Sequence, residues 1–263
     1  MPLPRRDVRG RGSHYLFALR RKSSGFGGCG CVGVLDKGCN GSGNVFASAY
    51  TLEQVITAGI ENCKRACAPY GALTALDVGP LGELLEPSGT LTFEDAVAEY
   101  TRIVKAGEAA GADLIFFETY TDLYELKAAL LAAKENTHLP ILASMSFEAG
   151  GRTFTGCTVE SFAATARGLG ADAVGINCSL GPKEIFPMAK RLAEAVPGNF
   201  PVFVKPNAGL PRADGSGYDI TPQLFALQMK PYRELHLFAA GGCCGTTPEF
   251  IQLLNGVFAD CKP

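Results

Sequence analysis

Three cysteines carry the sharpest chemical signal in the sequence. Cys243 and Cys244 are adjacent in a Gly-Gly-Cys-Cys-Gly run, and Cys178 follows an asparagine well upstream. Adjacent cysteines are geometrically poor disulfide partners for each other. Three soft sulfur ligands suit Zn²⁺ or Cu(I), and a zinc ion with only three protein ligands keeps the open position that is typical of a catalytic site. The sequence therefore predicts a zinc site formed by Cys178, Cys243 and Cys244.

Such a site favours transfer of an alkyl group onto sulfur. Three thiolate ligands leave zinc a weak Lewis acid and a poor activator of water, so hydrolysis is disfavoured. The metal can still hold an incoming thiol as its thiolate at neutral pH. Because a thiolate is a far better nucleophile than a thiol, we predict that the three cysteines are catalytic as well as metal-binding residues.

The other cysteines and the histidines give weaker signals. Ten cysteines in a chain of 263 residues with no apolar signal segment do not predict a disulfide framework. Cys63 and Cys67 lie four residues apart on one face of an expected helix and are interpreted as core residues. A small metal knuckle is an alternative that lacks a fourth ligand; its candidates are Cys29, Cys31 and Cys39. The histidines, none of them well placed for catalysis, are His14, His138 and His236.

From residue 72 onward, short apolar segments alternate with segments of helical spacing. Nearly continuous apolar strands are typical of a parallel sheet covered on both faces, and their separation of about 30–40 residues is that of a βαβ unit. Six such units predict a (β/α)8 barrel, with its first one or two units either within residues 1–50 or incomplete. The expected strands are 72–77, 114–118, 140–146, 173–177, 201–205 and 235–240, and the expected helices include 52–67, 93–110, 122–135, 159–169 and 184–195.

Polar residues recur where these strands end. In a (β/α) barrel the carboxyl ends of the strands meet on one face, and that face carries the active site. Each residue could instead cap a helix or stabilise a loop, but their shared position favours a single site. The residues are Asp77, Glu118, Ser144 or Ser146, Asn177 with Cys178, Asn207, and Cys243 with Cys244.

The composition narrows the classes of partner. A hydrophobic content of 47% and a charged content of 19% exclude a disordered chain, and the net charge of −2 gives no general reason to bind nucleic acid. No apolar run approaches the ~18 residues of a membrane span, so we expect a cytoplasmic protein without membrane partners. Residues 1–22 hold seven arginines or lysines against one aspartate, which is compatible with a transit peptide or with a disordered or misassigned leader.

Five short segments, in this order, form a specific pattern that resembles the homocysteine-binding domain family of homocysteine S-methyltransferases. The pattern is most similar to the amino-terminal homocysteine module of cobalamin-dependent methionine synthase, and more distantly to betaine–homocysteine methyltransferase. The resemblance extends from about Asn44 to Leu254. The segments are Ala75-Leu-Asp-Val-Gly-Pro80, Glu118-Thr119 with Asp122, Gly175-Ile-Asn-Cys-Ser-Leu-Gly-Pro182, Pro206-Asn-Ala-Gly-Leu-Pro211 and Gly241-Gly-Cys-Cys-Gly-Thr-Thr-Pro248.

The resemblance implies a (β/α)8 barrel and a zinc-dependent homocysteine S-methyltransferase that forms methionine. It assigns the zinc to Cys178, Cys243 and Cys244. It also implies that Glu118 binds the amino group of homocysteine and that Asn207 lies beside the zinc, where we hypothesise that its amide oxygen fills the vacant position before substrate arrives. Homocysteine would coordinate through sulfur, lose its proton and attack a methyl group in an in-line displacement.

The front of the chain departs from the family. The family opens with a Leu-Asp-Gly-Gly/Ala-Met-Gly-Thr strand whose Asp helps to bind the substrate amine, whereas this sequence has only Val34-Leu-Asp-Lys-Gly38. The second family strand, which ends in Thr-Asn-Thr-Phe-Gly, is matched at most by Asn44-Val-Phe46. We therefore expect residues 1–43 to be an atypical segment rich in Arg, Gly and Cys, and residues 44–263 to be the homocysteine-binding barrel domain. Asp36 is not predicted to be a site residue.

The chain lacks the length for the remaining modules of a complete methionine synthase, so the methyl donor is expected to be external. Candidates are methylcobalamin on a separate corrinoid protein or domain, and a small sulfonium or betaine-type compound.

The sequence leaves two alternatives to the methyltransferase hypothesis. One is a module that binds zinc and homocysteine without turnover, because its N-terminal strands are missing. The other is a barrel enzyme that binds phosphate at the helix opened by Thr246-Thr-Pro248.

Overall fold

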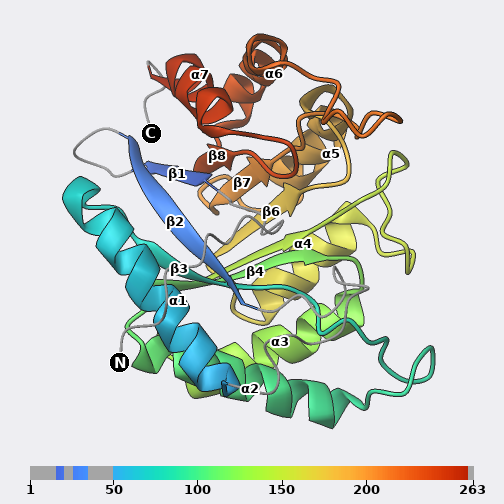
Figure 1. The fold of residues 1–263 in the computed structure, drawn as a ribbon. Helices are drawn as coiled ribbons and strands as arrows, with labels where there is room; N and C mark the ends of the chain where they lie inside the picture. The colour runs from blue at the N-terminus through green and yellow to red at the C-terminus, as the bar shows by residue number, and fades with distance from the viewer. Residues whose placement is uncertain (1–15, 21–25, 35–49, 260–263) are drawn as a thin grey trace.

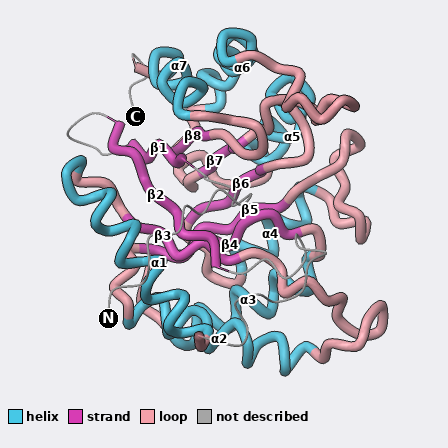
Figure 2. The backbone as a smooth tube through the Cα atoms, in the orientation of Figure 1, coloured by secondary structure: helices cyan, strands magenta, loops and turns pink. Residues whose placement is uncertain are grey.

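The computed structural model describes residues 16–20, 26–34 and 50–259, which form a closed ring of strands with helices outside it (Figures 1 and 2). The strands follow one another around the ring in sequence order. They are β1 (Leu16–Arg20), β2 (Phe26–Val34), β3 (Thr74–Val78), β4 (Leu114–Tyr120), β5 (Ile141–Met145), β6 (Ala173–Asn177), β7 (Val202–Lys205) and β8 (Ala239–Gly241). The helices are α1 (Leu52–Cys67), η1 (Ala68–Tyr70), α2 (Phe93–Ala109), α3 (Leu123–Asn136), α4 (Val159–Gly168), α5 (Pro182–Glu194), α6 (Pro222–Met229), η2 (Lys230–Leu235) and α7 (Pro248–Phe258).

The six predicted βα units correspond to β3–α2 through β8–α7. Every neighbouring pair of strands from β2 to β8 is parallel, as their apolar composition predicted. One boundary was wrong. The strand expected at 235–240 begins only at Ala239, because Lys230–Leu235 form a 3-10 helix and His236 takes a left-handed backbone conformation with φ of 48°.

The first two strands do not form a regular βα unit. β1 pairs antiparallel with both β2 and β8 and thereby closes the ring. Residues 21–25 alone separate β1 from β2, whereas a parallel connection needs about a dozen residues or more. The predicted barrel, possibly incomplete at its first two βα units, is therefore confirmed as a fold, and the irregular strand is β1, because β2 is followed by α1 and is parallel to β3. Among the residues and bounds named in the sequence analysis, His14, Asp36, Cys39 and the boundary at 43/44 lie outside the described residues.

Helix caps come from residues other than the buried carboxylates. The hydroxyl of Thr92 accepts a hydrogen bond from the backbone N of Asp95 at the start of α2. Asp122 caps α3 by accepting from the backbone N of Tyr124. Since these two residues cap the helices that follow β3 and β4, a capping role for Asp77 or Glu118 is excluded.

The interior of the ring changes from apolar to polar along the strands. Toward the amino ends of the strands, the inward-facing side chains form an apolar layer. In this layer the Phe116 and Phe203 rings meet edge to face with centroids 5.3 Å apart. Because inward-facing positions recur every second residue, the next layer lies two residues further along each strand. On four strands that layer is polar and buried, and its residues are Asp77, Glu118, Ser144 and Lys205. On β6 the buried polar residue is Asn177, four residues beyond Ala173. The carboxyl end of the ring is therefore the end that can carry polar chemistry.

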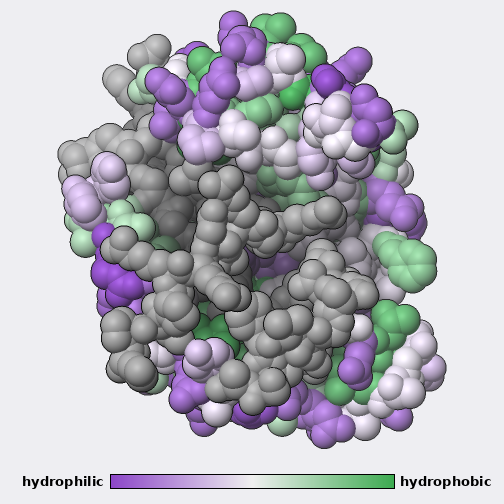
Figure 3. Space-filling model, in the orientation of Figure 1, coloured by the Kyte–Doolittle hydropathy of each residue, from purple (hydrophilic) through white to green (hydrophobic). Residues whose placement is uncertain are grey.

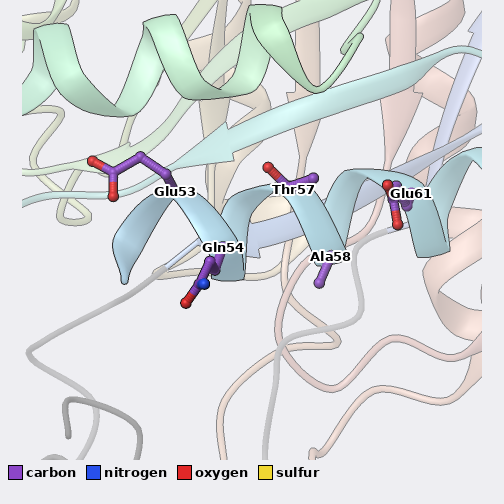
Figure 4. Close-up of a pocket in the computed structure, with 5 residues that line it drawn as sticks. All are labelled: Glu53, Gln54, Thr57, Ala58 and Glu61. Atoms are coloured by element: carbon purple, nitrogen blue, oxygen red, sulfur yellow. The ribbon is translucent and has the colours of Figure 1, made fainter. Parts of the chain in front are cut away.

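The outside of the molecule offers less chemistry. No helix in the described part of the chain has both the length and the apolar composition needed to cross a lipid bilayer. Hydrophilic and hydrophobic residues alternate over the described surface visible in Figure 3. A hollow along α1 (Figure 4) contains none of the predicted site residues; it is lined by Glu53, Gln54, Thr57, Ala58 and Glu61.

Candidate metal centre

Three thiols meet at the carboxyl end of the ring. The Sγ atoms of Cys178, Cys243 and Cys244 all lie within 4.8 Å of one another, and those of Cys178 and Cys244 are 3.6 Å apart. Tetrahedral zinc with Zn–S bonds of ~2.3 Å implies sulfur separations of about 3.8 Å. The three side chains thus fit a zinc ion with little rearrangement. Contacts with Cys178 and then Cys243 lower the pKa of Cys244 to about 3, while contacts with Cys243 and Cys244 raise the pKa of Cys178.

Backbone hydrogen bonds between neighbouring strand ends hold the thiols in place. The N–H of Cys178, after β6, donates to the carbonyl of Lys205 at 3.0 Å. The N–H of Cys243, after β8, donates to the carbonyl of Pro206 at 2.8 Å, and the hydroxyl of Thr246 donates to the carbonyl of Cys243 at 2.6 Å. The end of β7 therefore joins the segments that carry the cysteines.

Several residues near the thiols adopt left-handed backbone conformations. Cys178, Ser179 and Thr119 have φ values of 62°, 61° and 67°. Such conformations cost a non-glycine residue about 1–3 kcal/mol and concentrate at functional sites. Gly245 has φ of 78°, and a Cβ there would lie 2.3 Å from the ring of Tyr218, so only glycine fits beside the cysteine pair.

Asn177 connects the thiols to a buried carboxylate. Its Nδ2 donates to Glu118 Oε1 at 3.0 Å and to Thr119 Oγ1 at 2.7 Å, and lies 3.7 Å from Cys243 Sγ. Its Oδ1 accepts from Ser144 Oγ at 2.8 Å and from the backbone N of Thr119 at 3.1 Å. The side chain is fully buried. Asn177 thus fixes the position of Glu118 relative to Cys243.

Glu118 pairs with a buried lysine that the sequence analysis missed. Lys205 Nζ lies 2.6 Å from Glu118 Oε1, and the two side chains are 0% and 2% exposed. Burial raises the pKa of Glu118 to about 7, against the lowering effect of Lys205. Burial and then the charge of Glu118 raise the pKa of Asp77 well above its usual range. The available signal was a lysine at the end of the otherwise apolar strand Val202–Lys205.

Asn207 lies beside the cysteine pair. Its Oδ1 accepts a hydrogen bond from the backbone N of Cys244 at 3.1 Å, and its own N–H donates to the carbonyl of Leu180 at 3.0 Å. The side chain is buried. The amide oxygen that we hypothesised to fill an open metal position therefore has a backbone partner in this structure.

The fold and the site define a (β/α) barrel protein with three convergent thiols and a buried carboxylate at its carboxyl end. The sequence then identifies the family, because residues 41–258 match the homocysteine S-methyltransferase family. The chain belongs to this family, which places it among the methyltransferases. The resemblance inferred from the five motifs is thereby confirmed.

Individual relatives agree with this assignment. The chain is 32% identical over 193 residues to the methionine synthase of Mycobacterium leprae (strain TN), covering 70% of this chain and 16% of that protein. It is 34% identical over 171 residues to the methionine synthase of Mycobacterium tuberculosis (strain ATCC 25618 / H37Rv), covering 62% of this chain and 14% of that protein. The chain thus corresponds to a small part of these relatives.

A solved structure shares the fold. The apo form of the Escherichia coli homocysteine methyltransferase MmuM superposes with a TM-score of 0.66 at 22% identity, covering 87% of this chain and 79% of that chain. Its metallated form superposes with a TM-score of 0.61 at 24% identity, covering 78% and 70%. At these identities the likeness supports the barrel fold.

Proposed function

We propose that this protein is a zinc-dependent homocysteine S-methyltransferase that produces methionine. The observation that carries the proposal is the meeting of three thiols within 4.8 Å, directly above a polar layer that contains Glu118. Cys178, Cys243 and Cys244 would hold the metal. When bound, zinc would keep the substrate sulfur as a thiolate at neutral pH, ready to accept a methyl group.

The residues around the three thiols are proposed to bind the substrate and to hold the cysteines in position. Glu118 is proposed to receive the ammonium group of homocysteine: Lys205 and Asn177 both engage Oε1, while Oε2 is buried with no hydrogen-bond partner among the described residues. Such a buried acceptor is costly unless a ligand fills it. Asn207 is proposed to hold the Cys243–Cys244 turn through the backbone N of Cys244.

The methyl donor is proposed to be external to the barrel. A methylcobalamin-bearing corrinoid protein or domain is one candidate, supported by the methionine synthase relatives of which this chain spans 16% and 14%. A small sulfonium or betaine-type compound is the other candidate.

We further propose that residues 44–263 form the homocysteine-binding domain and that residues 1–43 precede it as a distinct segment. We also propose that the protein acts in the cytoplasm.

The test is zinc content together with turnover. The purified protein is expected to hold about one zinc per chain by elemental analysis and to methylate homocysteine with methylcobalamin, a sulfonium compound or betaine. Cys243→Ser is expected to lose both properties. Cys157→Ser is the control, since this half-buried thiol lies away from the cluster and contacts the carbonyl of Thr158.

Three results would contradict the proposal. A folded wild type without zinc would exclude the metal site. Zinc and homocysteine binding without turnover on any donor would favour the binding-module alternative. Full activity of Cys243→Ser would favour the phosphate-binding alternative, which has less support because the Thr246 hydroxyl is engaged by the carbonyl of Cys243.

A further inference from the structure

We propose that Tyr218 is a positioning residue whose hydroxyl donates a hydrogen bond to Sγ of Cys244 and thereby directs methyl transfer to the substrate sulfur rather than to this cysteine. The inference rests on the proposed function and extends it, because it addresses which of several metal-bound sulfurs is methylated.

Three sulfurs of the protein would compete with the substrate for the methyl group. Zinc would hold the thiolates of Cys178, Cys243 and Cys244 beside that of homocysteine, and a thiolate is the nucleophilic form of sulfur. Cys243 is only 3% exposed, whereas Cys178 and Cys244 are half-buried. Methylation would convert a cysteine to a thioether without the negative charge of a thiolate ligand. The site therefore needs its accessible cysteine sulfurs to be less reactive than the substrate sulfur.

The connection between β7 and α6 places Tyr218 at the cysteine pair. This connection folds back on itself, and the carboxylate of Asp219 accepts a hydrogen bond from the backbone N of Leu210 across it at 2.8 Å. It is also tied to the site, because the backbone N of Ala208 donates to the carbonyl of Cys244 at 2.9 Å. The position of Tyr218 relative to Cys244 is thus fixed by the backbone on both sides.

The side chain of Tyr218 faces the thiols. Its ring packs over Gly245, where an added Cβ would lie 2.3 Å from a ring carbon. A hydrogen bond joins the side chains of Tyr218 and Cys244, while Cys178 and Cys243 interact with the same tyrosine through their charge. Cys244 is therefore the sulfur that the hydroxyl engages.

This hydrogen bond distinguishes a thiolate from a methylated sulfur. A metal-bound thiolate carries no proton, so the hydroxyl of Tyr218 must be the donor. Hydrogen bonds to a charged acceptor are stronger than those between neutral groups, whereas a thioether sulfur is a weak acceptor. Methylation of Cys244 would forfeit the bond. The bond therefore stabilises the thiolate and slows its attack on a methyl donor.

The experiment methylates the zinc-loaded protein with methyl iodide in the absence of homocysteine. A sulfur that attacks the methyl carbon forms an S–C bond, and iodide leaves with the electron pair of the broken C–I bond. Tandem mass spectrometry of peptides gives the rate at each cysteine. Wild type is expected to methylate Cys244 more slowly than Cys178. In Tyr218→Phe the rate at Cys244 should rise roughly tenfold, because a hydrogen bond to a charged group is lost, and the rate at Cys178 should change less than about twofold.

Two further variants separate the hydroxyl from the ring and from the substitution itself. Tyr218→Phe keeps the ring over Gly245, whereas Tyr218→Leu removes the ring as well, and circular dichroism checks that each is folded. Tyr70→Phe is the matched control, because Tyr70 is 79% exposed in η1, which precedes β3 at the amino end of the ring. It should keep the wild-type rates at all three cysteines.

Three outcomes would overturn the proposal. One is an unchanged rate at Cys244 in Tyr218→Phe. Another is a rise in Tyr218→Leu alone, which would mean that the ring merely covers the sulfur. The third is an equal rise at Cys178 and Cys244, because a general opening of the site would expose both. Should the variants not fold, faster methylation of Cys244 than of Cys178 in wild type would contradict the proposal, and slower methylation would support it.

Elemental analysis of the same samples reports separately on the proposed function. A folded wild type without zinc would contradict that function. The hydrogen bond would then act on a metal-free sulfur. A selective rise at Cys244 in Tyr218→Phe would still support the role of Tyr218, and its absence would overturn it.

Discussion

Two groups of cysteines in this protein have similar sulfur separations and very different surroundings. On α1, the Sγ atoms of Cys63 and Cys67 are 3.7 Å apart, and both side chains are buried. At the carboxyl end of the ring, the Sγ atoms of Cys178 and Cys244 are 3.6 Å apart, with Cys243 as a third member. The α1 pair lies on the core-facing side of one helix, whereas the other group is assembled from two strand ends.

The difference shows that a short sulfur–sulfur distance alone does not make a metal site. Two thiols four residues apart on a helix must face the same way, and an apolar core is a sufficient reason for them to be there. At the barrel mouth a third sulfur is present, and the amide of Asn177 contacts both Cys243 and Glu118. Hydrogen bonds from residues behind the ligands orient metal ligands. We do not expect the Cys63–Cys67 pair to have such an arrangement.

The largest expected effect is a difference in bound zinc between variants of the two cysteine groups. Cys178→Ser removes a proposed ligand, so zinc affinity should fall by more than the roughly 10–100-fold that loss of an outer contact costs. Cys63→Ser should retain about one zinc per chain. Both are measured by elemental analysis after dialysis against a chelator. Equal zinc loss in the two variants would break the comparison.

The next effect concerns the buried charge beneath the thiols. Lys205→Met leaves Glu118 in a dry site without its ammonium partner, and breaking such a pair typically costs about 3–5 kcal/mol of the free energy of unfolding. Lys105→Met, at an exposed position on α2, should change this free energy by at most about 0.5 kcal/mol. Urea unfolding measures both. A difference below about 1 kcal/mol between them would show that the pair is not effectively buried.

A smaller effect tests the link between the thiols and the carboxylate. Asn177→Ala keeps every proposed ligand but removes the amide that holds Cys243 and Glu118 together, so zinc affinity should fall roughly 10–100-fold. Competition with a chromophoric chelator measures this affinity. Asn136→Ala serves as control, because that amide donates to the carbonyl of Ala132 within α3. Unchanged zinc affinity in Asn177→Ala would mean that the ligands are oriented by the backbone alone.

The smallest effect belongs to the helix pair. Cys67→Ala removes one buried sulfur from the core and should lower the free energy of unfolding by about 1 kcal/mol, the typical cost of a single substitution. Zinc content should stay at the wild-type value. Urea unfolding and elemental analysis of the same preparation measure the two quantities. A drop in zinc content would show that α1 contributes to the metal site.

Much of the fold was predictable because its signals are local. Each strand from β3 to β7 is a short, mostly apolar run with a polar residue at or beside its carboxyl end, so both the barrel and the position of its site could be inferred. The antiparallel arrangement of β1 could not be, since the Gly-rich sequence around Phe26–Val34 has no periodicity that distinguishes its neighbours. The late start of β8 depends on a turn at His236, whose left-handed conformation has no sequence signal.

By itself the sequence determined which chemistry is available: three cysteines near strand ends, two of them adjacent, and acidic and amide side chains at the same ends of other strands. The tertiary structure decided which of them meet. Cys178 and Cys244 come from β6 and β8, which are separated by β7, and Lys205 reaches Glu118 across 87 residues of sequence. These contacts depend on how the whole ring curves and closes, which no local pattern encodes, because curvature is set jointly by every strand in the barrel.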